Sequence, residues 1–243
     1  MELHTQELVL NGKKIRYLYG GKGKKLLFLH GWPMQPRHYV RSLGIVAERF
    51  EVYAPFLFDF PSGTFSEMAA CVEEMLAKLG ITRIAVAGTS FGGAIAAIIA
   101  SRRPDMVRRL VLANSAGLPM KISAAGVFAQ AAKNWRMLAA KRKFAILCGI
   151  FLGGMYFSAG LLAEQRRALL RDMRTTTLEA AFKRIRAKTL IAWSREDRLF
   201  PASYARFLNQ AIKNSRVALV QGAHGWPNHQ PELFASLIMQ GAK

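Results

Sequence analysis

The chain has 243 residues, 51% of them hydrophobic, and a formal net charge of +20 from 35 Lys and Arg against 15 Asp and Glu. This length and apolar content fit one sizeable core and exclude a disordered chain. The charge favours anionic partners, but no zinc-finger spacing or RNA-binding motif accompanies it, so we expect no nucleic-acid partner. The first residues lack the pattern of a signal peptide, and we expect a cytoplasmic protein, either free or peripheral to a membrane.

In chain order, the sequence predicts short strands that alternate with helices. The expected strands are 7–10, 14–19, 26–29, 51–55, 83–88, 109–114, 188–193 and 216–220, and the expected helices lie within 36–49, 64–79, 91–103, 202–212 and after 231. Several strands are continuous apolar runs, such as LLFL and LVLAN, which is typical of strands buried on both faces. We therefore expect an α/β fold with a mostly parallel sheet of about eight strands and helices on both faces.

The alternation stops between Gly117 and Lys188, where the pattern is helical and the charge is 14 Lys and Arg against 3 Asp and Glu. Within it, Phe144–Ala163 carries no charge and is long enough to span a membrane. Four glycines interrupt this run, and a span would separate the two halves of the site described below. We interpret 117–188 as a helical cap inserted in a core domain of 1–116 and 189–243. The alternative is peripheral docking of the basic cap on an anionic membrane.

A glycine-rich turn separates the predicted strand 83–88 from the helix 91–103. Its sequence, GTSFGG at 88–93, has the G-x-S-x-G pattern in a strand–turn–helix context, which places Ser90 above the sheet edge as a candidate nucleophile. A serine hydroxyl needs a base, and His224 and His229 both follow the last strand. The base needs an orienting acid, and Asp197 follows a strand at the same edge.

Four motifs in this order, LHGWP at 29–33, GTSFGG, WSREDRLFP at 193–201 and GAHGWPNHQPELF at 222–234, resemble the α/β-hydrolase superfamily in its cap-bearing serine esterase and lipase branch. The resemblance covers nearly the whole chain outside 117–188. It implies that Ser90, Asp197 and His224 are catalytic, with His229 as a wall or surface residue. It also implies that the backbone N–H groups of Trp32 and Phe91 form the oxyanion hole and that His30 has a structural role.

Three positions depart from the family pattern. The family usually has aspartate right after the proline that ends the fourth strand, whereas here Phe56 follows and an aspartate comes only at Asp59. Ser194 replaces a usual glycine, and Thr89 stands where histidine is frequent. These departures bear on substrate preference, since each expected catalytic residue is present.

The residues and the resemblance together predict hydrolysis of a carboxylic ester of an apolar acyl group through an acyl-enzyme, with no metal and no cofactor. Epoxide hydrolases and haloalkane dehalogenases need a carboxylate where this chain has Ser90. Two alternatives remain. One is a thioesterase or acyltransferase that acts on an anionic carrier. The other, from a different class, is a catalytically silent lipid- or membrane-binding protein of the same fold.

Overall fold

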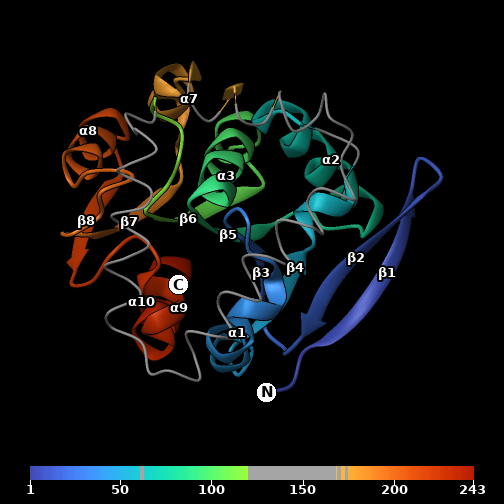
Figure 1. The fold of residues 1–243 in the computed structure, drawn as a ribbon. Helices are drawn as coiled ribbons and strands as arrows, with labels where there is room; N and C mark the ends of the chain where they lie inside the picture. The colour runs from blue at the N-terminus through green and yellow to red at the C-terminus, as the bar shows by residue number, and fades with distance from the viewer. Residues whose placement is uncertain (61–62, 120–167, 169–170, 173–174) are drawn as a thin grey trace.

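Six parallel strands form the main body of the sheet, and an antiparallel hairpin extends it at one side (Figure 1). In this computed structural model, which describes residues 1–60, 63–119, 168, 171–172 and 175–243, the strand order is β1-β2-β4-β3-β5-β6-β7-β8. The strands are β1 His4–Leu10, β2 Lys13–Gly20, β3 Lys24–Leu29, β4 Phe50–Pro55, β5 Ile84–Thr89, β6 Val107–Ala113, β7 Lys188–Ser194 and β8 Ser215–Val220. The predicted mostly parallel sheet of eight strands is confirmed.

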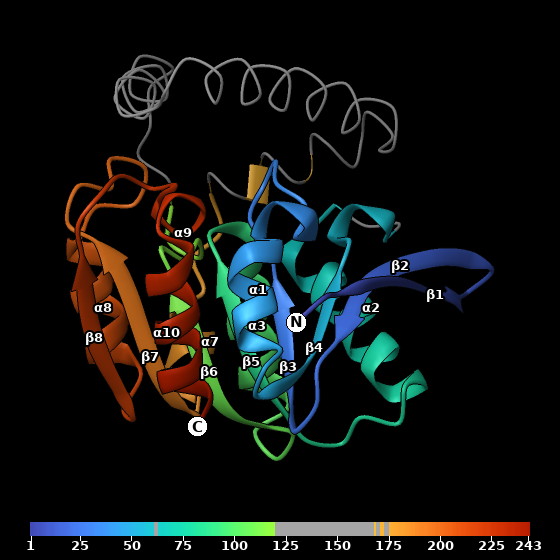
Figure 2. The same cartoon turned by 90° about the horizontal axis from the view of Figure 1, so that it is seen from below.

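Helices cover both faces of the sheet and bury two apolar clusters against it (Figures 1 and 2). The helical elements are η1 Pro36–Tyr39, α1 Val40–Val46, η2 Leu57–Asp59, α2 Phe65–Lys78, α3 Phe91–Arg102, α7 Glu179–Arg184, α8 Ser203–Ala211, α9 Trp226–His229 and α10 Pro231–Ala242. Val72 of α2 and Phe182 of α7 belong to one cluster, whereas Leu43 of α1 and Phe234 of α10 belong to the other. Each face of the sheet therefore has its own core.

Most of the expected cap, 117–188, lies outside the described residues, including the apolar run 144–163. At its boundaries, Gly117 accepts a backbone hydrogen bond from Leu178 (2.7 Å), and Asp172 accepts one from the backbone of Phe65 (2.7 Å). These contacts hold both ends of the segment near the edge of the sheet where β6 ends. Among the helices that the structure describes, none is long and apolar enough to cross a membrane.

Asp59, the aspartate displaced from its usual position, binds the neighbouring hairpin. Its carboxylate accepts two hydrogen bonds from the Arg16 guanidinium (2.7 and 2.8 Å) and one from the Arg16 backbone (3.1 Å). The Asp59 side chain is only 10% exposed, so the carboxylate of this bidentate pair is largely shielded from water. The aspartate thus fixes the η2 turn onto β2.

His30, which follows β3, is fully buried and connects its own loop to η2. Its Nε2 accepts a hydrogen bond from the backbone N–H of Leu57 (3.1 Å), and its Nδ1 lies 3.1 Å from the carbonyl oxygen of Gly31. An amide can only donate, so Nε2 carries no proton and the neutral ring donates from Nδ1. Burial lowers the pKa of His30 to about 4, although the hydrogen bond to Gly31 opposes the shift. The structural role expected for His30 agrees with these contacts.

The buried His30 predicts acid lability. In the unfolded chain this histidine has an ordinary pKa of about 6.5, so it takes up a proton before the folded protein does. Stability is therefore full above pH 6.5 and falls as the pH drops towards 4, by about 3 kcal/mol for a pKa difference of this size. Urea unfolding at several pH values should show that His30→Gln, whose amide oxygen can accept from Leu57, loses less stability over this range. Equal losses in both proteins would contradict the account.

Candidate active site

Ser90 occupies a sharp turn between β5 and α3. Its backbone has φ 50° and ψ −120°, a left-handed conformation that L residues rarely adopt. The turn is held by hydrogen bonds from Ser90 N to the carbonyl of Ala113 (3.0 Å) and from Ala116 N to the carbonyl of Ser90 (2.9 Å). Strain of this kind persists only where the surroundings enforce it, and it often marks a functional site. The turn raises the Ser90 hydroxyl above the carboxyl end of the sheet.

The glycines around Ser90 are required by close packing of the backbone. A Cβ atom on Gly88 would lie 2.5 Å from the carbonyl oxygen of Gly92. A Cβ atom on Gly92 would overlap the backbone of Leu29 at the end of β3. The G-x-S-x-G spacing therefore lets α3 start directly over β3 and β5, which brings its N-terminus to the hydroxyl.

His224 lies on the loop after β8, with its imidazole directed at Ser90. Its Nε2 is 3.0 Å from Ser90 Oγ, which is hydrogen-bonding distance for a base that takes the hydroxyl proton. Phe200 packs against the imidazole, with the ring centroids 5.4 Å apart, and the His224 side chain is 16% exposed. The other histidine that follows β8, His229, is the last residue of α9 and is exposed.

Asp197, on the loop after β7, holds the other side of the imidazole. Its Oδ2 is 2.7 Å from His224 Nδ1, and its side chain is fully buried. Its Oδ1 accepts hydrogen bonds from the backbone N–H groups of Leu199 (2.7 Å) and Phe200 (2.9 Å). The structure thus brings together Ser90, His224 and Asp197, although Ser90 and His224 are 134 positions apart in the sequence. The imidazole lies between the hydroxyl and the carboxylate.

Asn114, immediately after β6, is a fourth residue of this network, and motif analysis missed it. Its Nδ2 donates to Asp197 Oδ2, the oxygen that also faces His224. Its Oδ1 accepts from Ser194 N (3.0 Å) and from the indole N–H of Trp226 (2.8 Å). Both of those groups are obligate donors, so the amide can have only this orientation. Asn114 has φ 43°, a backbone conformation in which asparagine is enriched. An asparagine directly after a predicted strand was therefore the feature of the sequence that could have pointed to this residue.

Ser194, the residue that replaces a glycine, joins the acid loop to the histidine loop. Its hydroxyl donates to the carbonyl oxygen of Gly222 and accepts from the backbone N–H of Glu196 (3.1 Å). The substitution therefore adds a direct tie between the two loops that carry Asp197 and His224.

The two segments expected to supply an oxyanion hole flank the Ser90 hydroxyl. Phe91 is the first residue of α3, and its backbone belongs to the N-terminus of that helix. On the other side, a Cβ atom on Gly31 would lie 3.1 Å from Ser90 Cβ and 3.7 Å from its Oγ, which places the loop carrying Trp32 against the serine. Helix N-termini and loop amides are the groups that stabilise a developing negative charge.

Aromatic side chains shape the same edge. Phe58 of η2 stacks on Phe91 with a centroid distance of 6.0 Å and also meets His30 edge-on at 5.3 Å. The segment 56–60, in which Phe56 follows the proline and the aspartate comes only at Asp59, thus provides an apolar wall next to the serine turn. Among the described residues, no group of three or more His, Cys, Asp or Glu could hold a metal ion.

Comparison with known proteins places this geometry in a wider group. Residues 26–237 match the model of the family described as "Alpha/beta hydrolase family". A soluble epoxide hydrolase of Corynebacterium sp. is 31% identical over 118 residues, 46% of this chain and 41% of that protein, so the match spans less than half of that relative. The 2-hydroxymuconate semialdehyde hydrolase of Pseudomonas putida is 28% identical over 259 residues, 96% of this chain and 92% of that protein.

Among solved structures, a membrane phospholipase A described as a bacterial virulence factor has the same fold. The TM-score is 0.79 at 23% identity, over 99% of this chain and 86% of that one. The family match covers most of the chain, including every strand from β4 to β8 and both the serine turn and the histidine loop. The chain therefore belongs to the alpha/beta hydrolase family.

Proposed function

We propose that this protein is a serine hydrolase that cleaves carboxylic esters of apolar acyl groups, with Ser90, His224 and Asp197 as its catalytic residues. The observation that supports it most is the 3.0 Å approach of His224 Nε2 to Ser90 Oγ, with Asp197 2.7 Å from Nδ1 on the other side of the ring. This is the arrangement that converts a weakly nucleophilic hydroxyl into an attacking one.

The mechanism follows from the positions of the proton carriers. Ser90 Oγ attacks the acyl carbon while His224 Nε2 takes its proton, and the buried Asp197 carboxylate stabilises the imidazolium that forms. The backbone N–H groups of Phe91 and Trp32 stabilise the oxyanion, an effect worth about 3 kcal/mol per donor in comparable enzymes. His224 then protonates the leaving alcohol, and water activated by the same ring releases the acid. No step requires a cofactor.

The identity of the nucleophile favours an ester substrate over an epoxide or a haloalkane, the substrate classes named for some of the relatives. Family members that open epoxides or remove halides use a carboxylate at the nucleophile position, and this chain has Ser90 there. An apolar acyl group fits the partly buried hydrophobic side chains on the loops at the carboxyl ends of the strands, namely Trp32, Phe58, Leu118, Leu178 and Leu199. The same residues would serve a thioester, and the substrate panel below separates the two bond types.

Replacing Ser90 tests the nucleophile. In Ser90→Ala, kcat on aryl esters should fall by at least about 10⁴-fold, and labelling by a fluorophosphonate probe should be lost, because among the described residues Ser90 Oγ is the hydroxyl within hydrogen-bonding distance of His224 Nε2. Ser101→Ala is the matched control, since Ser101 is also buried on α3 but donates only to the carbonyl of Ile98. Undiminished labelling of Ser90→Ala would reject the proposal.

A substrate panel tests the bond type. Aryl esters of increasing acyl length should be cleaved faster than the matched acyl thioesters on a small carrier, with kcat/KM rising as the acyl chain lengthens. Higher kcat/KM for thioesters, lost in Ser90→Ala, would favour the thioesterase alternative. No turnover of either series, with vesicle binding retained, would favour the silent lipid-binding alternative.

Replacing Asn114 tests how Asp197 is kept charged. Asn114→Asp keeps an acceptor for Ser194 N and Trp226 Nε1 but places a carboxylate against Asp197. Two carboxylates this close cannot both be fully charged, so the pair shares one proton near neutral pH, and its single negative charge is no longer confined to the Asp197 oxygen that faces His224. We expect kcat/KM at pH 7 to fall at least about tenfold and the acid limb of the pH profile to change shape, because the ionisation of the pair is added to that of the base.

The matched control for this test is Asn209→Asp, an asparagine-to-aspartate change at an exposed position of α8. It should leave both the rate and the pH profile unchanged. A pH profile of Asn114→Asp that has the wild-type shape, with only a lower plateau, would mean that Asn114 acts through stability alone.

A further inference from the structure

The end of the sheet at which the parallel strands begin, opposite the end that carries Ser90, has a dense row of cations. The six parallel strands all begin at this edge, because their partners run in the same direction. Each of the six strands has at least one exposed Lys or Arg close to its start. Nine of these residues, in the order of the sheet from β4 to β8, are Arg49, Lys22, Lys24, Arg83, Arg103, Arg108, Arg186, Lys188 and Lys213, and we refer to these nine as the basic edge.

Few carboxylates offset this charge. On the same segments, the exposed acidic side chains are Glu48 and Asp105. Within the part of the chain that the structure describes, Arg108 is the one member of the basic edge with a carboxylate in ion-pair distance, 3.6 Å from Asp105, and that pair is largely exposed. An exposed pair of this kind contributes little and does not remove the local positive field.

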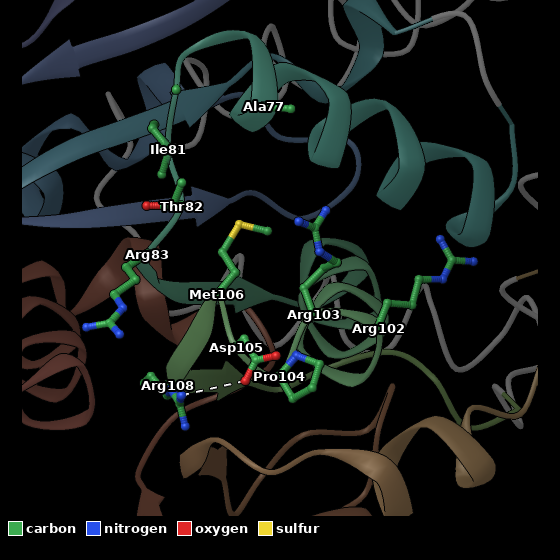
Figure 3. A pocket seen from close by; sticks show the side chains of 11 residues that line it. Ala77, Ile81, Thr82, Arg83, Arg102, Arg103, Pro104, Asp105, Met106 and Arg108 are labelled. Atoms are coloured by element: carbon green, nitrogen blue, oxygen red, sulfur yellow. Dashed lines mark ion pairs between the residues drawn. The ribbon is translucent and has the colours of Figure 1, made fainter.

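The middle of the basic edge is hollowed. Residues before β5 and β6 surround a depression of about 670 Å³ (Figure 3). Arg83, Arg103 and Arg108 stand at separate points around Met106 in this view, with Asp105 as the single carboxylate among the lining residues. Guanidinium groups around a hollow are suited to phosphate oxygens, which they bind by paired hydrogen bonds.

The positive charge is denser at this edge than on the loops after β7 and β8 at the opposite ends of the strands. On the opposite edge, the loops after β7 and β8 carry two exposed cations, Arg195 and Arg198, beside the acidic Glu196 and Asp197. These two loops are thus close to neutral. The two edges differ in the kind of partner that their charge attracts.

We propose that the basic edge is a docking surface for an anionic phospholipid bilayer, with lipid phosphates seated at the hollow between Arg83, Arg103 and Arg108. The row follows six adjacent strands and so extends about 24 Å along one side of the molecule, a broad face suited to a planar surface. Lys and Arg held near anionic lipids each contribute to binding, and nine of them are sufficient without any inserted apolar group.

A nucleic acid fits this face less well. Single strands are held by stacking of bases on aromatic rings, and the described segments of the basic edge expose none, since their aromatic residue, Phe50, is buried. A nucleic-acid duplex would be held only through its phosphates. The test below therefore compares binding of duplex DNA with binding of vesicles. The proposal also differs from docking through the cap, because the basic edge and Ser90 lie at opposite ends of the strands. A bilayer bound here leaves the active site facing the aqueous phase.

The test is co-sedimentation of the full chain with vesicles of phosphatidylcholine mixed with phosphatidylserine, and with vesicles of phosphatidylcholine alone. Wild type should bind the mixed vesicles at low salt, release them at high salt, and ignore phosphatidylcholine. The triple variant Arg83→Gln, Arg103→Gln, Lys188→Gln should bind on the order of 100-fold more weakly, at about fivefold per cation.

The matched control removes three exposed cations elsewhere, with Lys13→Gln, Lys14→Gln and Arg206→Gln. It should bind like wild type, and ester turnover and circular dichroism should be the same in all three proteins. Equal loss of binding in both triple variants would show a general charge effect and overturn the proposal. So would wild-type binding by the basic-edge variant, or binding of duplex DNA by a wild-type protein that does not bind the mixed vesicles.

Discussion

The imidazole of His224 lies between a hydroxyl and a carboxylate from two other loops, and this depends on a buried charge being kept in place. The Asp197 side chain is fully buried, and its two oxygens accept hydrogen bonds from two backbone amides, from Asn114 and from His224. These four donors replace the water that the carboxylate loses on burial, since an unpaired charge in such a place costs several kcal/mol. A fully satisfied carboxylate can then orient the ring towards Ser90.

The other contacts around the site hold the turn and the loops that carry Ser90, His224 and Asp197. The glycines at 88 and 92 allow β5 and α3 to meet at a strained turn, which lifts Ser90 above the sheet. Ser194 and Asn114 tie together the loops after β6, β7 and β8. His30 and Asp59 fix the loop after β3 and the turn after β4, which form the apolar side of the site. The sheet provides the frame, and side-chain hydrogen bonds between the loops hold Ser90, His224 and Asp197 in their positions.

The strands of the sheet and the serine turn could be predicted from the sequence, because both are determined by residues that are close together in the chain. Continuous apolar runs identify β3, β5, β6 and β7, and the G-x-S-x-G turn needs its glycines for steric reasons that hold in any context. Asn114 could not be predicted in the same way, because its role depends on Trp226 and Asp197, which are 112 and 83 positions away. The role of Asp59 likewise depends on Arg16 from a distant hairpin. The basic edge could not be predicted from the sequence, because its charges are dispersed along the chain and come together only when the parallel strands align.

The most direct test of the central claim is the proton NMR spectrum of the protein near neutral pH, without substrate. A proton on His224 Nδ1 that is hydrogen-bonded to a buried carboxylate should resonate downfield of the backbone amides, and burial should slow its exchange with water. The account predicts that this resonance persists in Ser90→Ala and disappears in Asp197→Asn and in His224→Gln. A downfield resonance that survives both of the latter substitutions, or none in any of the proteins, would contradict the proposed hydrogen bond between His224 Nδ1 and the buried Asp197 carboxylate.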